Sequence, residues 1–523
     1  MTPPLSPRFF NTTGPCRPDK HYMLPPERRL PAVRRLVDEE RYFVVHAARQ
    51  TGKTTAMRAL AEQLRAEGQV ALHVSLEASR HTPSLAEVEP RWIQAVVDHA
   101  RWTLPAADRP PEGAGAGAPG TRLAGLLGDW AMALHPRPLV LLLDEVDTIE
   151  GEAMVNFLAQ LRSGFNHRPR TFPSSIVLVG LRDLKDYLVQ AKGGLPPNPG
   201  SPFNIKAESL TLRNFTRDEV AELYSQHTDD TGQPFTGDAI DRSWFWTRGQ
   251  PFLVNALAYH LTRREPIPAP TPITGADIDR AKEALLLSRT THLDNLVRRL
   301  HEPRVARILR PILLGELPPT DVSDDFDYAA DLGLLVKGES GWEPANPLYR
   351  EVLIGALVQV PQDVLPAPWW PWRTVDGRLD LPALIDAFLD WWRRHGDLLI
   401  EQADAGWREA AAHLAFMAFL QRVVNGGGQV HREYASGRGR LDLLVQYGPD
   451  RFVIELKRVP PAHVSLQTVR EEGIAQLAGY LDQLGLAEGW MLVFDQRPGQ
   501  SWEQRRWREQ VERGGKVLHL FGS

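Results

Sequence analysis

The stretch that decides the fold is Ala47-Ala48-Arg49-Gln50-Thr51-Gly52-Lys53-Thr54-Thr55. The apolar run Tyr42–Ala47 leads into it, and a helical pattern over Thr54–Glu67 follows it. A turn from a buried strand into a helix points backbone N–H groups at an anion, while a lysine and a neighbouring hydroxyl serve phosphate oxygens and Mg²⁺. Gly52, Lys53 and Thr54 hold these positions, although Ala47 stands where glycine is usual. We therefore predict that residues 48–55 bind the phosphates of a nucleoside triphosphate.

An acidic pair follows a second apolar run further along the chain. Leu139–Leu143 reads LVLLL and ends in Asp144-Glu145. An acid at the carboxyl end of a strand can hold Mg²⁺ together with Thr54, and the next acid can orient or deprotonate a water molecule. We predict Asp144 as a metal ligand and Glu145 as a catalytic residue. The alternative is an ordinary strand end that caps the next turn.

Short apolar runs alternate with helical patterns in this part of the chain. The runs are Tyr42–Ala47, Val70–Leu76, Leu139–Leu143 and Ile176–Gly180, and the helical patterns include Thr54–Glu67 and Ala153–Gly164. Continuous apolar strands separated by helices are typical of a parallel sheet covered on both faces. The sequence therefore predicts an α/β fold. An incidental lysine in the loop is a weak alternative, because only nine of the 523 residues are lysine.

The composition excludes several classes of protein. The formal net charge is −5, so no overall positive charge attracts polyanions or anionic membranes. A lone cysteine, Cys16, excludes an intramolecular disulfide framework and a cysteine-built zinc site. No run approaches 18 apolar residues, and Met1–Phe10 lacks the pattern of a signal peptide. We expect a cytoplasmic protein without a membrane partner.

The first two thirds of the chain resemble a known family. The similarity is carried by Phe10–Pro15, His21–Pro26, Arg49–Thr55, Leu143–Asp147, Val179–Asp183, Ser201–Ile205 and Gly249–Asn255. These segments resemble the AAA-ATPase-like proteins, bacterial P-loop ATPases of the additional-strand type. The resemblance implies ATP and Mg²⁺ as cofactors, a helical lid and a winged helix. It also implies a sensor near Arg182 or Asp183 and an arginine finger at Arg162, Arg168 or Arg170, which would require a homo-oligomer.

A second group of charged residues lies near the other end of the chain. Asp442 begins the run Leu441–Tyr447, and Glu455 and Lys457 lie in Phe452–Lys457. If these runs pair as strands, Glu455 and Lys457 share one face, because side chains alternate along a strand. Two carboxylates can hold Mg²⁺, and a lysine can steady water or phosphate. The competing interpretation is a solvated strand face.

Residues from about Trp407 to Phe521 resemble the PD-(D/E)XK nuclease superfamily. The resemblance implies Asp442 and Glu455 as metal ligands, Lys457 as a catalytic residue and Glu409 as a further acid. Mg²⁺ is the expected metal, with Mn²⁺ as an alternative. Gln476–Tyr480 fits a helical motif of one branch. The charge of this region is nearly balanced, with 15 basic and 13 acidic residues, and Arg505, Arg506, Arg508 and Arg513 are expected to mark a solvated helix.

The complete prediction combines the two resemblances. It comprises an N-terminal segment over 1–40, a P-loop ATPase core over 41–210, a helical lid over 211–290, a winged helix over 291–360, a Pro/Trp linker and helix over 361–400, and an α/β PD-(D/E)XK nuclease-like domain over 401–523. Two stretches, Leu104–Thr121 and Lys192–Pro202, are expected to be surface loops, the first of them flexible.

The predicted function is ATP-dependent gating of nucleic-acid cleavage, with DNA preferred over RNA as substrate. The nuclease resemblance implies a role in host defence or DNA processing. Two alternatives stay open. One is a signalling or scaffold ATPase whose C-terminal domain binds without cleaving. The other is a regulator that binds DNA through the winged helix. The five aspartates within residues 321–331 favour a packing role for that element.

Overall fold

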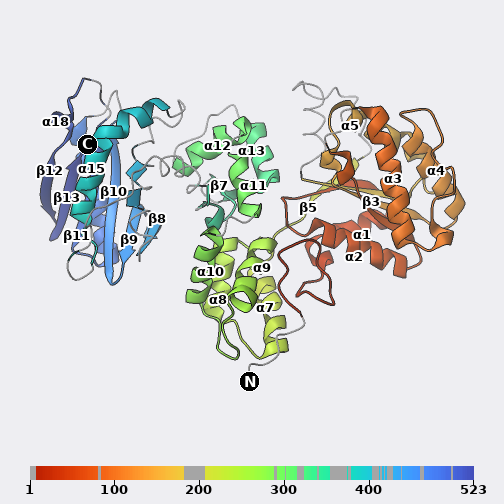
Figure 1. Ribbon diagram of the computed structural model, residues 1–523, viewed down its shortest axis with the longest axis horizontal. Coiled ribbons are helices and arrows are strands. Elements are labelled where there is room, and N and C mark those ends of the chain that lie inside the picture. Colours follow the sequence, from red (N-terminus) through yellow and green to blue (C-terminus); the bar gives the residue numbers. More distant parts are fainter. Residues whose placement is uncertain are drawn as a thin grey trace. The chain divides into compact units, whose positions relative to one another are not determined.

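A computed structural model of the chain describes residues 8–80, 84–181, 206–287, 291–300, 302–314, 323–338, 341–350, 352–353, 374, 378–402, 412, 415–416, 419–420, 428–436, 439–459, 465–495, 497 and 499–523. The chain divides into two compact units, Met1–Val352 and Leu353–Ser523 (Figure 1). Each unit contains its own sheet, and each is described by itself.

The first unit is built on a five-stranded parallel sheet. Its strands are β1 (Tyr42–His46), β2 (Val70–Ser75), β3 (Leu139–Asp144), β4 (Ser175–Gly180) and β5 (Lys206–Thr211). They lie in the order β2-β3-β4-β1-β5, and every adjacent pair is parallel. Strand β4 therefore separates β1 from β3, and this confirms the predicted parallel sheet. The carboxyl ends of β1 and β3, where the predicted nucleotide residues begin, lie at the same edge.

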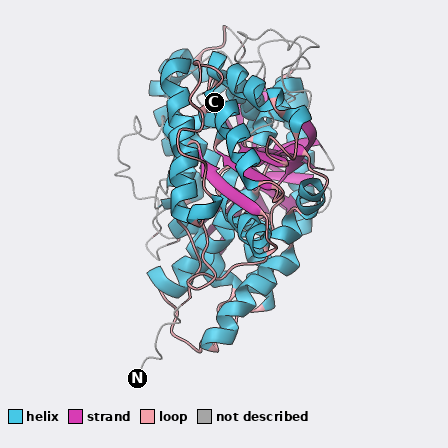
Figure 2. Ribbon diagram, turned by 90° about the vertical axis from the view of Figure 1, so that its right-hand side faces the viewer, coloured by secondary structure: helices cyan, strands magenta, loops and turns pink. Residues whose placement is uncertain are grey.

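Helices cover both faces of this sheet (Figure 2). They are α1 (Pro31–Asp38), α2 (Lys53–Ala66), α3 (Leu85–Thr103), α4 (Arg122–Leu134) and α5 (Gly151–Ser163). Along β3, Leu139, Leu141 and Leu143 pack in the core beneath α3, α4 and α5, whereas Val140 and Leu142 pack in the core with α1 and α2. This alternation explains the continuous apolar runs, because a strand buried on both faces has no side for polar residues.

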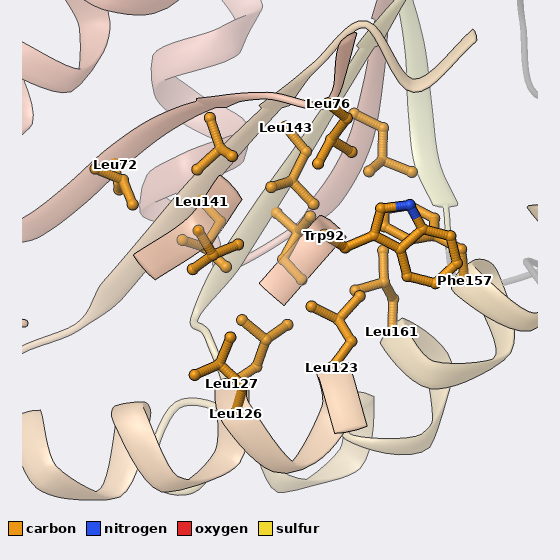
Figure 3. Packing of buried hydrophobic residues seen from close by; sticks show 14 of the residues in the cluster. Leu72, Leu76, Trp92, Leu123, Leu126, Leu127, Leu141, Leu143, Phe157 and Leu161 are labelled. Atoms are coloured by element: carbon orange, nitrogen blue, oxygen red, sulfur yellow. The ribbon is translucent and has the colours of Figure 1, made fainter. Parts of the chain in front are cut away.

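The larger core packs leucines of the sheet against aromatic residues of the helices (Figure 3). Trp92 on α3 and Phe157 on α5 meet edge to face, with ring centroids 5.1 Å apart. Both side chains are at most 1% exposed. This dense packing fixes α3 and α5 on the sheet, and with them the strand end that carries Asp144.

The low-complexity stretch Leu104–Thr121 is ordered against these helices, contrary to the flexible loop that its composition predicts. Ala114 packs against the core, and the buried carboxylate of Glu89 accepts hydrogen bonds from the backbone N–H groups of Gly120 and Arg122. The composition did not reveal this, because the partner that holds the stretch lies on α3.

Four helices follow the sheet. They are α7 (Arg217–Thr231), α8 (Gly237–Thr247), α9 (Pro251–Tyr259), which continues as a π-helical turn at His260–Arg264, and α10 (Gly275–Leu287). The N-terminal segment packs on them through Phe10, whose ring contacts Tyr224, His227 and Phe235. Trp246 is buried in this part of the unit, whereas the neighbouring Phe245 is 40% exposed.

Three helices and a hairpin complete the unit: α11 (Thr291–Arg299), α12 (Pro303–Leu314), α13 (Ser323–Asp331), β6 (Leu335–Gly338) and β7 (Gly341–Pro344). The assignment of residues 291–360 as a winged helix stays a prediction. Helix α13 carries Asp324, Asp325, Asp327 and Asp331 and no basic residue. A helix with this charge is a poor match for a phosphate backbone.

His292 makes the stability of this region dependent on pH. Its Nε2 lies 2.6 Å from the Tyr349 hydroxyl, and its ring packs on Phe252. Burial lowers the pKa of His292 to about 4. Since the unfolded chain has a pKa near 6.5, the unfolded state binds the proton first, and the stability contributed at pH 7 is lost between about pH 6.5 and 4.

We expect acidification from pH 7 to pH 5 to cost about 1 to 2 kcal/mol at this site. In His292→Gln the fall in melting temperature between these pH values should be smaller than in the native protein. An equal fall in both proteins would contradict the assignment.

The second unit contains a six-stranded mixed sheet. Its strands are β8 (Gly428–Ser436), β9 (Gly439–Tyr447), β10 (Asp450–Val459), β11 (Glu488–Asp495), β12 (Arg508–Arg513) and β13 (Lys516–Gly522), in the order β12-β13-β11-β10-β9-β8. Strands β10, β11 and β13 run parallel, and the other neighbours are antiparallel. The β9–β10 hairpin is the one that the sequence predicts.

Helices pack on this sheet too. Helix α17 (Leu466–Leu484) packs through Leu477 and Leu481 on a core that includes Val453 and Met491. Helix α15 (Leu381–Gln402) contributes Phe388, whose ring meets that of Phe494 on β11. The second unit thus takes in α15, most of which falls in the stretch 361–400 that the sequence assigns to a linker and helix.

The prediction that Arg505, Arg506, Arg508 and Arg513 mark a solvated helix is wrong. Residues Arg508–Arg513 form the edge strand β12, and only Trp502–Arg505 is helical (α18). A mostly exposed, charged edge strand has the same composition as a solvated helix, so charge alone did not separate the two. No helix among the described residues has the length and apolar character needed to cross a bilayer.

Candidate functional site

The first candidate site is the loop between β1 and α2. Gly52 has φ of 94° and precedes the first residue of α2, and Gln50 also has a positive φ of 58°. A left-handed residue immediately before a helix reverses the chain, and glycine adopts it without steric cost. The loop thereby turns toward the start of α2, where unpaired N–H groups and the helix dipole favour an anion.

The side chain of Lys53 hydrogen-bonds the backbone of this loop. Its Nζ donates hydrogen bonds to the carbonyl oxygens of Ala47 at 2.6 Å and Ala48 at 2.8 Å. Burial lowers the pKa of Lys53 to about 8, although the carboxylates of Asp144 and Asp147 oppose the shift. A half-buried ammonium that donates to two neutral carbonyls is well placed to exchange them for phosphate oxygens.

Asp144 and Thr54 meet at the same edge of the sheet. The Thr54 hydroxyl donates to Asp144 Oδ2 at 2.7 Å, and His73 Nε2 lies 3.1 Å from the same oxygen. Burial raises the pKa of Asp144, but the His73 and Thr54 hydrogen bonds and the charge of Lys53 outweigh it, so the pKa is lowered overall. A hydroxyl and an ionised carboxylate are oxygen donors of the kind that Mg²⁺ prefers. The residues present therefore fit the predicted metal.

Glu145 adopts a left-handed conformation with φ of 61° directly after β3. Its backbone N–H donates to Asp144 Oδ1 at 2.9 Å, and its side chain accepts a hydrogen bond from the Ser75 hydroxyl at 2.6 Å. Burial raises the pKa of Glu145, and the bond from Ser75 opposes that shift in part. The carboxylate is thus held at the end of β2, beside the predicted metal ligand.

The other predicted loop residues have distinct surroundings. Thr51 Oγ1 donates to the Ala48 carbonyl, and Thr55 Oγ1 accepts from the backbone N–H of Cys16. Arg49 is exposed. The hydroxyl of Thr55 therefore tethers the N-terminal segment to α2, a role that the motif alone does not indicate.

Several residues around the loop were not found from the sequence. His73 and Ser75 lie on β2, Arg29 lies in a 3₁₀ turn before α1, and Gln250 precedes α9. Gln250 Nε2 lies 3.5 Å from the Gln50 carbonyl. Their contacts span tens to hundreds of residues of sequence, so no local pattern could have revealed them.

The acidic helix α13 also ends beside the loop. Asp331 Oδ1 lies 3.5 Å from His46 Nδ1 at the end of β1. Gly333 follows, and a Cβ atom at this glycine would lie 2.4 Å from the Ala48 Cβ. This close approach supports the packing role that the sequence favours for this element.

Of the three arginine-finger candidates, Arg168 stacks on aromatic rings of its own chain. Its guanidinium lies over the rings of Phe165 at 3.6 Å and Tyr42 at 5.1 Å. Arg162 and Arg170 are exposed. The sensor candidates Arg182 and Asp183 lie outside the described residues.

The second candidate site lies on the face of the C-terminal sheet that α17 covers. Lys457 Nζ lies 2.8 Å from Glu455 Oε1 and donates to Gln476 Oε1 on α17 at 2.5 Å. The Glu455 side chain is 3% exposed and that of Lys457 is 22% exposed. Ile454 and Leu456 are buried, as the alternation predicts. Glu455 and Lys457 thus share a face.

The hairpin register sets the position of Asp442. Leu443 pairs with Ile454 in the antiparallel β9–β10 ladder, so Asp442 and Glu455 are the next residues along the two strands. Glu409 lies outside the described residues. No cluster of three or more acidic, histidine or cysteine side chains that could hold a metal occurs in the described part of the chain.

Helix α17 approaches this site closely because residue 473 is glycine. A Cβ there would lie 2.4 Å from Met491 Sδ and 3.2 Å from Lys457 Cγ. The absence of a side chain lets the stem of Lys457 lie against the helix, which brings its ammonium to Gln476. The sequence motif Gln476–Tyr480 contributes this contact through its first residue.

Comparison with known proteins gives a family match over the part of the chain that contains the first of these sites. The AAA domain family matches residues 35–188. Among solved structures, the Walker-type ATPase PABY2304 of Pyrococcus abyssi is 15% identical, covers 66% of this chain and 99% of its own, and has a TM-score of 0.48. The ORC1 protein of Aeropyrum pernix in complex with DNA is 13% identical (66% and 95% covered, TM-score 0.34).

The RuvB Holliday junction branch migration motor of Thermotoga maritima is 13% identical, covers 62% of this chain and 92% of its own, and has a TM-score of 0.33. No curated protein matches the chain. The family match spans the loop, Asp144 and Glu145, and it stops before the C-terminal sheet begins.

Proposed function

We propose that the AAA-like P-loop ATPase domain, to which residues 35–188 belong, hydrolyses ATP and thereby controls metal-dependent phosphodiester cleavage by the C-terminal unit. The observation that carries the ATPase part is the convergence of Lys53, Thr54 and Asp144 at one sheet edge, with Glu145 beside them. The cleavage part rests on the buried pair Glu455–Lys457, with Asp442 opposite Glu455.

In the ATPase site each residue has one task. The N–H groups at the start of α2 and the Lys53 ammonium bind the phosphates. Thr54 and Asp144 hold Mg²⁺, which supplies charge neutralisation at the phosphates when bound. Glu145 orients the attacking water and accepts its proton, and burial raises its pKa, which makes it a stronger base than an exposed glutamate. A finger from Arg162 or Arg170 would come from a second copy in a homo-oligomer.

Glu145→Gln tests the ATPase assignment. The amide keeps the size of the side chain but cannot accept a proton, so kcat for ATP hydrolysis should fall by at least about 100-fold while the Kd for ATP stays within about threefold. Phosphate release and equilibrium binding measure the two quantities.

Glu150→Gln is the matched control, because Glu150 is exposed on the same segment and should leave both quantities unchanged. Hydrolysis that persists in Glu145→Gln would contradict the role of Glu145.

In the proposed nuclease site the carboxylates of Asp442 and Glu455 would hold Mg²⁺ or Mn²⁺. Lys457 would neutralise the scissile phosphate or steady the attacking water. A buried carboxylate in an apolar strand requires a compensating charge, and Lys457 supplies it in the described structure. Nucleic acid, DNA in preference to RNA, is the proposed substrate.

The same ion pair also fits a second function, a non-cleaving binding module on an ATPase. Lys457 is engaged by both Glu455 and Gln476, as it would be in a purely structural pair. Cleavage assays with defined variants separate the two functions.

A further inference from the structure

The guanidinium of Arg29 is bound to the outside of the phosphate loop. Its Nη2 donates to the Thr51 carbonyl at 2.8 Å, and its Nε donates to the Arg213 carbonyl at 2.7 Å. Nη2 also contacts the Arg213 carbonyl. The residue is 7% exposed. A single buried side chain thus joins the loop to the segment that leads from β5 into α7.

The charge of Arg29 acts on a particular peptide group. The Thr51 carbonyl and the Gly52 N–H belong to the same peptide, and Gly52 immediately precedes Lys53. A cation that binds a carbonyl polarises the peptide and strengthens its N–H as a donor. Arg29 Nη1 would lie 3.4 Å from a Cβ at Gly52, so the cation is also close to this turn of the loop.

Among the residues that the structure describes, Arg29 forms no ion pair with a carboxylate. The nearby carboxylate of Glu219 is engaged by both terminal nitrogens of Arg213, at 2.6 and 2.8 Å. Burial lowers the pKa of Arg29 to about 10, which still leaves it charged at neutral pH. A buried cation beside an anion-binding loop is stabilised when the anion arrives.

Arg29 also contacts Phe215, which lies just before α7 and is joined by a hydrogen bond to the segment before α9. Its guanidinium lies 4.8 Å from the centre of the Phe215 ring, and the Phe215 N–H donates to the Gly249 carbonyl at 2.9 Å. Gly249 can only be glycine here, because a Cβ would lie 1.9 Å from the Phe215 carbonyl oxygen. Gln250 follows and approaches the loop at Gln50.

We propose that Arg29 is a positioning residue for ATP binding, which holds the Thr51–Gly52 peptide in its phosphate-binding orientation and ties it to the Arg213–Phe215 segment. The inference rests on the proposed ATPase function. Arg29 contacts the loop from the side of its carbonyls, so it acts through the peptide and not on the phosphates.

The test compares Arg29→Met, Arg29→Lys and the native full chain. In Arg29→Met the KM and Kd for ATP should rise by about 30-fold, because the charged hydrogen bond to the loop is lost. The kcat should stay within about threefold, since Thr54, Asp144 and Glu145 are untouched. Arg29→Lys keeps the charge but lacks the fork that reaches both carbonyls, so its KM should rise by only about fivefold.

Arg28→Met is the matched control. Arg28 is the neighbouring residue, and its side chain pairs with Glu222 at the surface. Its KM should stay within about twofold of the native value. If Arg29→Met does not fold, Arg29→Lys with a native melting temperature carries the test.

The outcomes separate this inference from the function on which it rests. A native chain that binds no ATP overturns both. A native chain that binds ATP, with an unchanged KM in the foldable Arg29 variants, overturns only the role of Arg29. A fall of kcat with an unchanged KM also overturns it, because Arg29 would then act on the chemical step.

Discussion

Lys53→Met is expected to raise the Kd for ATP by at least about 100-fold. The methionine fills a similar volume but removes the ammonium, which is the only side-chain cation that the described structure places inside the loop, where it bonds the carbonyls of Ala47 and Ala48. Displacement of a fluorescent nucleotide from the full-length protein measures the change.

The same variant should fold normally. Removing a buried ammonium relieves a desolvation cost, which offsets the two lost hydrogen bonds, so the melting temperature without nucleotide should change by less than about 3 °C. Lys20→Met is the matched control, because Lys20 is exposed in the N-terminal segment. ATP affinity retained in Lys53→Met, or lost equally in Lys20→Met, would show that the nucleotide does not bind at this loop.

The second large effect is expected at the C-terminal sheet. Lys457→Ala and Glu455→Gln should each reduce Mg²⁺- or Mn²⁺-dependent cleavage of DNA by at least about 100-fold. Glu455→Gln removes the charge of a proposed metal ligand, and Lys457→Ala removes the cation at the scissile phosphate. Asp442→Ala should have an effect of the same size. Cleavage of labelled single- and double-stranded DNA and RNA, with and without ATP, measures it.

Lys516→Ala is the control within the same sheet. Lys516 lies on β13, its side chain is 19% exposed, and it pairs with Asp482. It should leave cleavage unchanged. A native protein that cleaves no nucleic acid with either metal would favour the non-cleaving binding module, and cleavage that survives all three substitutions would place the activity elsewhere.

Within the first unit, the sequence determined the sheet and the strand ends that carry the predicted nucleotide-binding residues. Apolar runs buried on both faces predicted parallel strands, and the residues at their ends followed from strand direction: Lys53 and Thr54 after β1, Asp144 and Glu145 after β3. These inferences succeeded because each depends on a few neighbouring residues. The helix boundaries were close for the same reason, as in α2, predicted over Thr54–Glu67 and observed over Lys53–Ala66.

In the second unit, the strand periodicity of the sequence predicted a smaller part of the fold. It correctly gave the β9–β10 hairpin and the shared face of Glu455 and Lys457. It failed at β12, where charges spaced along an edge strand were taken for a helix. The order β12-β13-β11-β10-β9-β8 could not be predicted, because strand pairing joins residues far apart in the sequence.

What only the tertiary structure decided is the surroundings of the proposed catalytic groups. His73 beside Asp144, Ser75 on Glu145, and Gln476 on Lys457 are contacts between separate elements. The charge and pKa of a side chain depend on what surrounds it in space, while a motif records only its neighbours along the chain. The sequence thus predicted the residues of the proposed phosphate loop, and folding supplied the partners that hold them in place.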